Sequence, residues 1–161
     1  MTENEFSPYL IIFSNVKLPL WAEFPDLELY MDQLVSLGNR YLADFLETPL
    51  TPSMVNSYVK KGVMSRPVKK KYQAKQLAEL LLISLLKSIY PLETIKNYIE
   101  LLDPIEDSYD SFVQCFNKTL TDLACESFLA PSLAQTTQQV IVNAVIFKAL
   151  GENMISQQKN S

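Results

Sequence analysis

Seven of the 14 lysines and arginines of this chain lie between Thr48 and Ala78, a segment without aspartate or glutamate. These residues are Lys60, Lys61, Arg66, Lys69, Lys70, Lys71 and Lys75. All 18 acidic residues lie elsewhere, and the chain as a whole carries a formal net charge of −4. Phosphate binding depends on local cation density and on counterion release, not on the net charge. The segment therefore predicts a docking site for a polyanion.

A short helix is predicted inside this basic segment, over residues 52–61. Thr51 is a typical N-cap, Pro52 suits the first helical position, and Gly62 suits the position that ends a helix. At helical spacing the apolar side chains fall on one side: Met54, Val55, Tyr58 and Val59. The polar side chains fall on the other: Ser53, Asn56, Ser57 and Lys60. One face is expected to pack and the other to reach a partner.

The polar face has the residue types that read the edges of base pairs. Asn56 can make a bidentate contact to adenine, and Lys60 or Lys61 can contact guanine or phosphate. Ser53 and Ser57 are short enough to form hydrogen bonds at close approach.

Residues 63–72 are too short, and too interrupted by Pro67, for a helix. They predict a small extended loop or a two-stranded wing. Its cations are expected to supply affinity independent of sequence: Arg66, Lys69, Lys70 and Lys71. A capped helix followed by a glycine turn and a basic wing is the arrangement with which winged helix-turn-helix proteins bind duplex DNA.

The surrounding elements are predicted to be helical. Apolar residues recur at three- and four-residue steps over 26–46, and a nearly all-apolar run over 74–90 predicts a buried central helix. Pro91 opens the next helix, which ends at Asp103-Pro104.

Two further helical runs are predicted beyond that point. Residues 109–128 have helical spacing, and a final run over about 133–150 is expected to stop at Gly151. The β-branched centre of the final run could suit a strand, but no partner strand of comparable strength is nearby. The predicted organisation is an arm anchored by Trp21 (1–25), a helix-turn-helix domain (26–103), a C-terminal helical region (104–151) and a frayed tail (152–161).

Several functional classes are disfavoured. The chain has no histidine and no glycine-rich phosphate loop, and its two cysteines, Cys115 and Cys125, are expected to be reduced and packed. We therefore expect no catalytic site, no cofactor and no metal. The apolar run over 9–13 is too short for an export signal or a membrane span, so a cytoplasmic location is expected.

Parts of the sequence resemble the bacterial family called domain of unknown function 1836. The resemblance covers about residues 18–103 and rests on LPLW (18–21), PDLELYMDQ (25–33), LTPSMVNSYVKKGV (50–63) and PVKKKY (67–72). It implies a cytoplasmic transcriptional regulator with a DNA-binding domain similar to the mercury-resistance-regulator (MerR) superfamily. The implied fold class is all-α, a winged helix-turn-helix with a short basic wing and a C-terminal helical region.

The match to the MerR pattern is partial. Tyr58 and the Gly62-Val63 step fall where that superfamily has its tyrosine and its wing-opening glycine. Asn56 stands where those regulators commonly have arginine, and their long C-terminal dimerisation helix is not expected here. A homodimer would then use another surface, within 105–150.

Two functional hypotheses follow from the sequence. The first is a homodimeric transcriptional regulator that binds double-stranded DNA through helix 52–61 and wing 63–72. The alternative is a protein-interaction module whose basic patch binds an acidic partner. The sequence does not indicate whether the C-terminal region senses a small-molecule effector.

Overall fold

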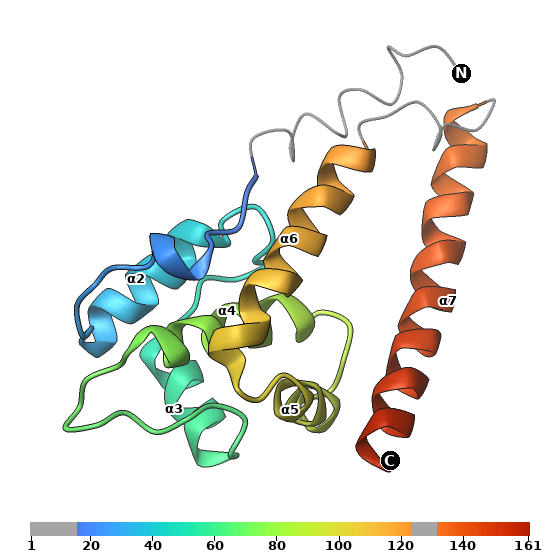
Figure 1. The fold of residues 1–161 in the computed structure, drawn as a ribbon. Helices are drawn as coiled ribbons and strands as arrows, with labels where there is room; N and C mark the ends of the chain where they lie inside the picture. The colour runs from blue at the N-terminus through green and yellow to red at the C-terminus, as the bar shows by residue number, and fades with distance from the viewer. Residues whose placement is uncertain (1–15, 124–131) are drawn as a thin grey trace.

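The computed structural model describes residues 16–123 and 132–161, and the regular elements in these ranges are helices (Figure 1). They are η1 (Trp21–Glu23), α2 (Met31–Tyr41), α3 (Pro52–Lys60), α4 (Ala74–Leu86), α5 (Leu92–Leu101), α6 (Ile105–Leu123) and α7 (Leu133–Lys159). Strand-like pairing in the described residues is limited to two isolated bridges, Leu29 with Tyr72 and Val68 with Lys71. The prediction of a mainly helical protein is confirmed.

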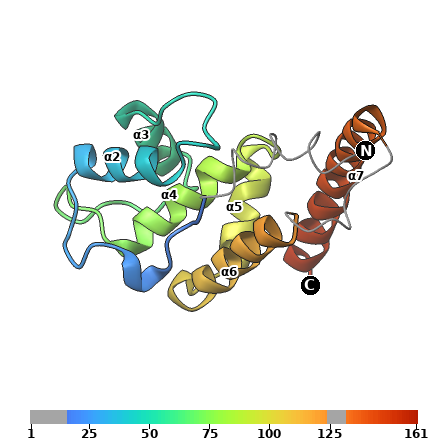
Figure 2. The ribbon, with the colours of Figure 1, turned by 90° about the horizontal axis from the view of Figure 1, so that it is seen from above.

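Helix α4 is the centre of the core, and α2, α5 and α6 pack around it (Figure 2). Every residue from Gln76 to Ser84 is buried, because the sequence is apolar around most of the helix. The predicted central helix is confirmed, although it ends at Leu86 instead of Tyr90.

Helix α2 is shorter than predicted at both ends, because residues 26–30 are not helical and the helix ends at Tyr41, before residues 42–46. Leu29 exchanges two backbone hydrogen bonds with Tyr72, both of 2.7 Å, and this pairing holds it extended. The Gln33 side chain then accepts a hydrogen bond from the Tyr30 amide at 2.9 Å and caps the start of α2. A pairing partner 43 residues away (72 − 29) therefore overrides the helical spacing.

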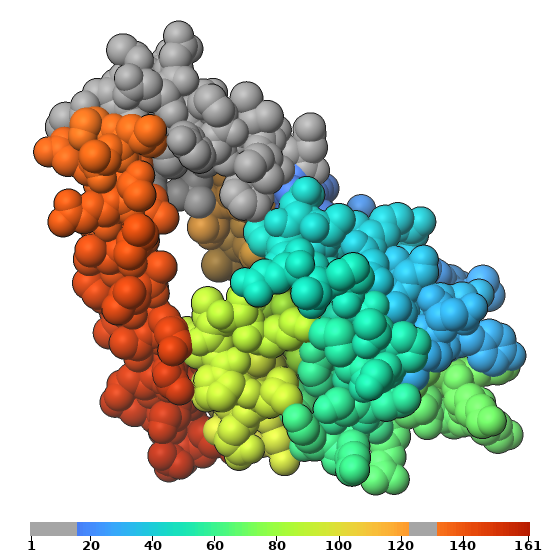
Figure 3. All heavy atoms as spheres, turned by 180° about the vertical axis from the view of Figure 1, so that it is seen from behind, coloured from blue at the N-terminus to red at the C-terminus, as the bar shows by residue number. Residues whose placement is uncertain are grey.

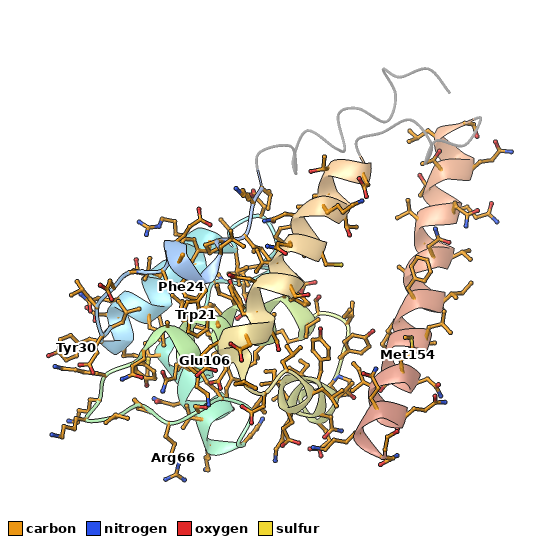
Figure 4. The ribbon with its side chains drawn as sticks, viewed as in Figure 1. Trp21, Phe24, Tyr30, Arg66, Glu106 and Met154 are labelled. Carbon is orange, nitrogen blue, oxygen red and sulfur yellow. The ribbon has the colours of Figure 1, made fainter. Side chains whose placement is uncertain are left out.

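The prediction that Trp21 anchors the N-terminal segment is confirmed for the described part of it. Trp21 and Phe24, labelled in Figure 4, pack with inclined rings against Tyr109 of α6, with ring centroids 6.1 and 5.2 Å from the tyrosine ring. The Trp21 amide donates to Asp110 Oδ1 at 2.7 Å. Aromatic packing and backbone hydrogen bonds therefore fix this segment on α6.

The hydrophobic core continues across Asp103-Pro104, where the sequence places a domain boundary. Ile105, Tyr109 and Val113 of α6 are buried in the same cluster as the side chains of α2 to α5. The Tyr109 hydroxyl donates to the Pro19 carbonyl at 3.0 Å, and burial raises the pKa of this tyrosine well above 10.0. Helix α6 therefore shares one hydrophobic core with the domain that contains the basic segment.

Helix α7 corrects two predictions, because it does not stop at Gly151 and residues 152–159 are helical rather than frayed. Gly151 packs against Tyr90, just before α5, where an added Cβ atom would overlap the tyrosine hydroxyl. Thr94 donates to Glu152 at 3.4 Å, and Lys159 pairs with Glu100. The glycine therefore permits close packing here and does not end the helix. At 27 residues, α7 also contradicts the expectation that the C-terminal region has only shorter helices.

Two smaller expectations concern the cysteines and the membrane. Cys115 is exposed on α6, so the prediction that it is packed is wrong, while Cys125 and Phe128 lie outside the described residues. Among the described helices, none combines the length and apolar character that a membrane span requires.

Candidate nucleic-acid interface

Helix α3 begins and ends where the local sequence signals predict. The Thr51 hydroxyl accepts a hydrogen bond from the Met54 amide at 3.3 Å, and Pro52 occupies the first turn. At the other end Val63 N donates to Tyr58 O and Gly62 N to Val59 O, both at 3.0 Å. These two bonds form a Schellman motif, which requires the left-handed conformation that Gly62 adopts with φ +73°.

The two faces of α3 differ as predicted. Val55 and Tyr58 are buried against the core. Four of the polar positions are exposed, namely Ser53, Asn56, Lys60 and Lys61, and Ser57 is half-buried. The helix therefore presents amide, hydroxyl and ammonium groups to solvent.

Asn39 of α2 fixes the entry to α3. Its side chain donates to the Leu50 carbonyl at 3.1 Å and accepts from the Leu50 amide at 2.7 Å. This paired contact sets the chain direction immediately before Thr51. Asn39 is a positioning residue that the local sequence does not reveal, since its partner is 11 residues away.

Residues 63–72, which we call the basic loop, are held to α4 by two buried polar side chains. Glu79 accepts hydrogen bonds from the Ser65 amide and hydroxyl at 2.8 and 2.7 Å. Gln76 donates to the Arg66 carbonyl at 3.0 Å. The loop backbone is thereby fixed to the central helix, although the side chains of Arg66, Lys69 and Lys70 are exposed.

The stability of the loop anchor should depend on pH. Burial raises the pKa of Glu79 above 4.5, although the hydrogen bonds from Ser65 lower it. Because the pKa of Glu79 is higher in the folded state, its contribution to the unfolding free energy is complete below pH 4.5. This contribution is lost as the pH rises through the folded pKa. A glutamine amide at this position can keep both contacts, so Glu79→Gln should flatten the pH dependence of the unfolding free energy by at most about 1.4 kcal/mol per pH unit. Urea unfolding at a series of pH values measures this; an identical change in Glu47→Gln, at an exposed glutamate, would contradict it.

The tip of the basic loop has an unusual backbone. Val68 and Lys71 exchange two hydrogen bonds of 3.0 Å, and the two residues between them, Lys69 and Lys70, have φ values of +50° and +63°. Two consecutive positive φ angles are typical of a type I′ turn, where asparagine and glycine are preferred. Each left-handed non-glycine residue costs about 1 kcal/mol or more. The chain therefore has two lysines at positions where smaller residues would be more stable.

Lys70→Gly should accordingly stabilise the protein by about 1 kcal/mol, because glycine adopts positive φ without steric strain. Thermal unfolding measures the change. The matched control is Lys61→Gly, because Lys61 has φ −81° and gains nothing from glycine. Equal shifts in the two variants would show that the strain at the turn is not the cause.

The four cations of the basic loop differ in their surroundings. Arg66, Lys69 and Lys70 are exposed, and Arg66 points away from the body of the protein (Figure 4). Lys71 is half-buried: its ammonium lies 3.4 Å from Glu28 and 5.8 Å from the centre of the Tyr30 ring. Of the predicted contact residues, Lys71 is thus the one already engaged within the chain.

The basic loop follows α3 directly in the chain, and both lie on the side of the molecule away from α7 (Figures 2 and 3). The family model of the domain of unknown function DUF1836 matches residues 19–123. The chain belongs to this family. No curated protein and no solved structure matches the chain. The predicted resemblance to DUF1836 is confirmed, and the match extends through α6, past the predicted end at 103.

The DUF1836 region contains the whole candidate interface and stops before α7. It also contains a lysine that the sequence pattern does not single out. Lys96 of α5 lies beside the end of α3, where its Nζ would be 3.6 Å from a Cβ atom built on Gly62. Lys96 is 34 residues from Gly62 in the sequence (96 − 62), so it lies next to the basic segment only because of the fold.

Proposed function

We propose that this protein is a transcriptional regulator that binds double-stranded DNA in the bacterial cytoplasm and has no catalytic role. In this proposal α3 enters the major groove, and the basic loop acts as a wing that contacts the phosphates beside it. The observation that supports it most directly is the exposure of the polar face of α3 together with that of the cations in the loop that directly follows it.

The dimensions and chemistry of α3 suit a recognition helix. A helix with its side chains is about 10–12 Å across, close to the width of the major groove of B-DNA. Asn56 is exposed in the middle of the face, with Lys60 one turn further on. The amide of Asn56 can pair with adenine, and the ammonium of Lys60 with guanine or phosphate.

The electrostatics favour a polyanion. Arg66, Lys69 and Lys70 form no ion pair with any described residue. Two carboxylates near the loop are engaged, since Glu79 is buried on Ser65 and Glu28 pairs with Lys71. The cations at the tip can therefore displace counterions from a phosphate backbone at little cost.

The strained turn supports the same function. A loop that served only to connect α3 and α4 would be more stable with asparagine and glycine at the tip. Backbone strain persists mainly where side chains at those positions are needed. Lys69 and Lys70 project from the tip in consecutive left-handed residues, as expected for side chains placed to reach phosphates.

The test is retention of a randomised duplex-DNA pool by the purified chain over a salt series, followed by sequencing of the retained fraction. One enriched motif together with a steep fall in affinity with salt would support a sequence-specific regulator. Weak retention without sequence preference would reject it and favour the alternative, an acidic protein partner for the basic surface.

Asn56→Ala should relax sequence preference at one base position. Loss of a bidentate contact to adenine is expected to weaken binding to the preferred site about tenfold while leaving binding to unrelated duplexes unchanged. Competition binding with the preferred and scrambled duplexes measures this difference. The control is Asn97→Ala on α5, a half-buried asparagine outside the proposed surface; an equal loss in both variants would exclude base reading by Asn56.

A further inference from the structure

Helix α7 exposes far more apolar surface than an isolated chain normally does. Eight of its large apolar side chains are exposed: Val140, Ile141, Val142, Val145, Ile146, Phe147, Leu150 and Met154. The segment 133–147 has no charged residue. A helix that is apolar around its circumference is normally buried on several sides, whereas α7 packs mainly on α5 through its C-terminal half (Figures 1 and 3).

The contacts with Tyr90 and α5 leave one seam of α7 uncovered. Lys148, Glu152 and Lys159 make these contacts. About a third of a turn away, residues recur at alternating steps of three and four: Val140, Asn143, Phe147, Leu150, Met154 and Gln157. This is the heptad spacing of a coiled-coil seam over about two and a half heptads. The four large apolar members are 40–63% exposed.

The exposed apolar area beside the seam is a large share of what a stable dimer needs. At roughly 150–200 Å² for each fully exposed side chain, the six half-exposed ones on the seam and its flanks, without Ile141 and Val145 on the opposite side, present roughly 500 Å². The largest apolar patch on a typical monomer is about 300–600 Å², and a standard interface buries about 800 Å² on each partner. The seam and its flanks could therefore supply more than half of one partner's share of an interface.

The composition of α7 favours a second copy of this chain over a membrane surface. Helices that lie on membranes have many lysines or arginines on their polar face. Helix α7 has only Lys148 and Lys159, and Lys159 already pairs with Glu100. Two uncharged seams can face each other about a two-fold axis without repulsion, with Asn143 as the polar residue that sets the register.

We propose that α7 is a dimerisation helix, and that the α7 seam of a second copy packs along Val140, Phe147, Leu150 and Met154. This inference does not depend on the proposed DNA binding. It places the dimer surface outside the DUF1836 region and at the opposite end of the molecule from the basic loop.

The test is sedimentation equilibrium of the full-length chain over a wide concentration range, without DNA. The wild-type chain should sediment as a dimer. Phe147→Glu with Leu150→Glu should raise the dimer dissociation constant by about a hundredfold or more, because two carboxylates would be buried in the seam. The matched control, Gln138→Glu with Ala149→Glu, adds the same charge on the opposite, exposed side of α7 and should remain dimeric.

Three outcomes would overturn the proposal. A wild-type chain that is monomeric at all concentrations would do so, as would equal dissociation of the two double variants. A monomer that co-floats with phosphatidylglycerol vesicles would assign α7 to a membrane surface instead. The seam is exposed in the single chain, so circular dichroism should show the same helix content and unfolding temperature for both variants as monomers.

Discussion

Replacing the two lysines at the tip of the basic loop, Lys69→Ala with Lys70→Ala, should weaken DNA binding about 30-fold at 150 mM salt for all duplex sequences. Each lysine that neutralises one phosphate contributes about 0.9 to the slope of log K against log salt. Removing two should therefore flatten this slope by roughly two. Fluorescence anisotropy with a labelled duplex over a salt series measures both quantities.

The matched control for the tip variant is Lys17→Ala with Lys118→Ala. These two exposed lysines flank the paired hydrogen bonds between Leu18 and Asn117, at the end of α6 that is far from α3 (Figure 1). The control removes the same charge, so an equal loss of affinity would mean that only the net charge matters. An unchanged salt slope in the tip variant would remove the basic loop from the proposed interface.

The structure indicates which two of the three loop lysines should be replaced to test phosphate contact. The sequence places Lys69, Lys70 and Lys71 together, with nothing to distinguish them. In the fold, Lys71 is drawn back onto Glu28 and Tyr30, whereas Lys69 and Lys70 form the tip. Substituting Lys71 would disturb contacts within the chain as well as any phosphate contact, so it is left out of the pair.

The elements that local signals determine could be predicted from the sequence. Thr51, Pro52 and Gly62 specify both ends of α3, because a cap, a fixed φ and a positive φ act within a few residues. The apolar periodicity likewise predicts that Val55 and Tyr58 are buried and that Asn56 and Lys60 are exposed. The polar face of the candidate site therefore follows from the sequence alone.

Features set by long-range contacts could not be predicted. Leu29 is extended because it pairs with Tyr72, and α7 passes through Gly151 because that residue packs on Tyr90. Both partners are distant in the sequence, so local spacing and the glycine signal gave the wrong helix ends. For the same reason the side chains that hold the interface in place, Asn39 and Glu79, carried no local signal.

The error at Gly151 had the largest functional consequence. With the helix ending there, the C-terminal region has only short apolar helices and no clear surface for a second copy. With the helix continuing to Lys159, Met154 and Gln157 extend the seam that starts at Val140. The spacing covers more than two heptads, as a coiled-coil seam needs, only when both sides of the glycine belong to one helix.

The seam variant, Phe147→Glu with Leu150→Glu, should reduce binding to a duplex with two inverted half-sites about a hundredfold or more, while binding to one half-site stays unchanged. A dimer joined through α7 presents two copies of α3 and the basic loop, so the second half-site binds at a high effective concentration. A monomer loses this gain without losing any contact, because α7 lies far from α3 (Figure 2). Anisotropy titrations with one-site and two-site duplexes taken from the enriched motif measure both affinities.

The two duplexes separate the two proposals. If the seam variant and its control, Gln138→Glu with Ala149→Glu, bind the two-site duplex equally, the α7 seam does not join the DNA-bound copies. If the tip variant leaves binding to the one-site duplex unchanged, the basic loop does not contact DNA, whatever α7 does. Loss of one-site binding in the seam variant alone would place α7 within the DNA surface, contrary to its position in the fold. Because the two surfaces lie at opposite ends of the chain, the one-site and two-site losses should be independent and additive in a protein that has both pairs of substitutions.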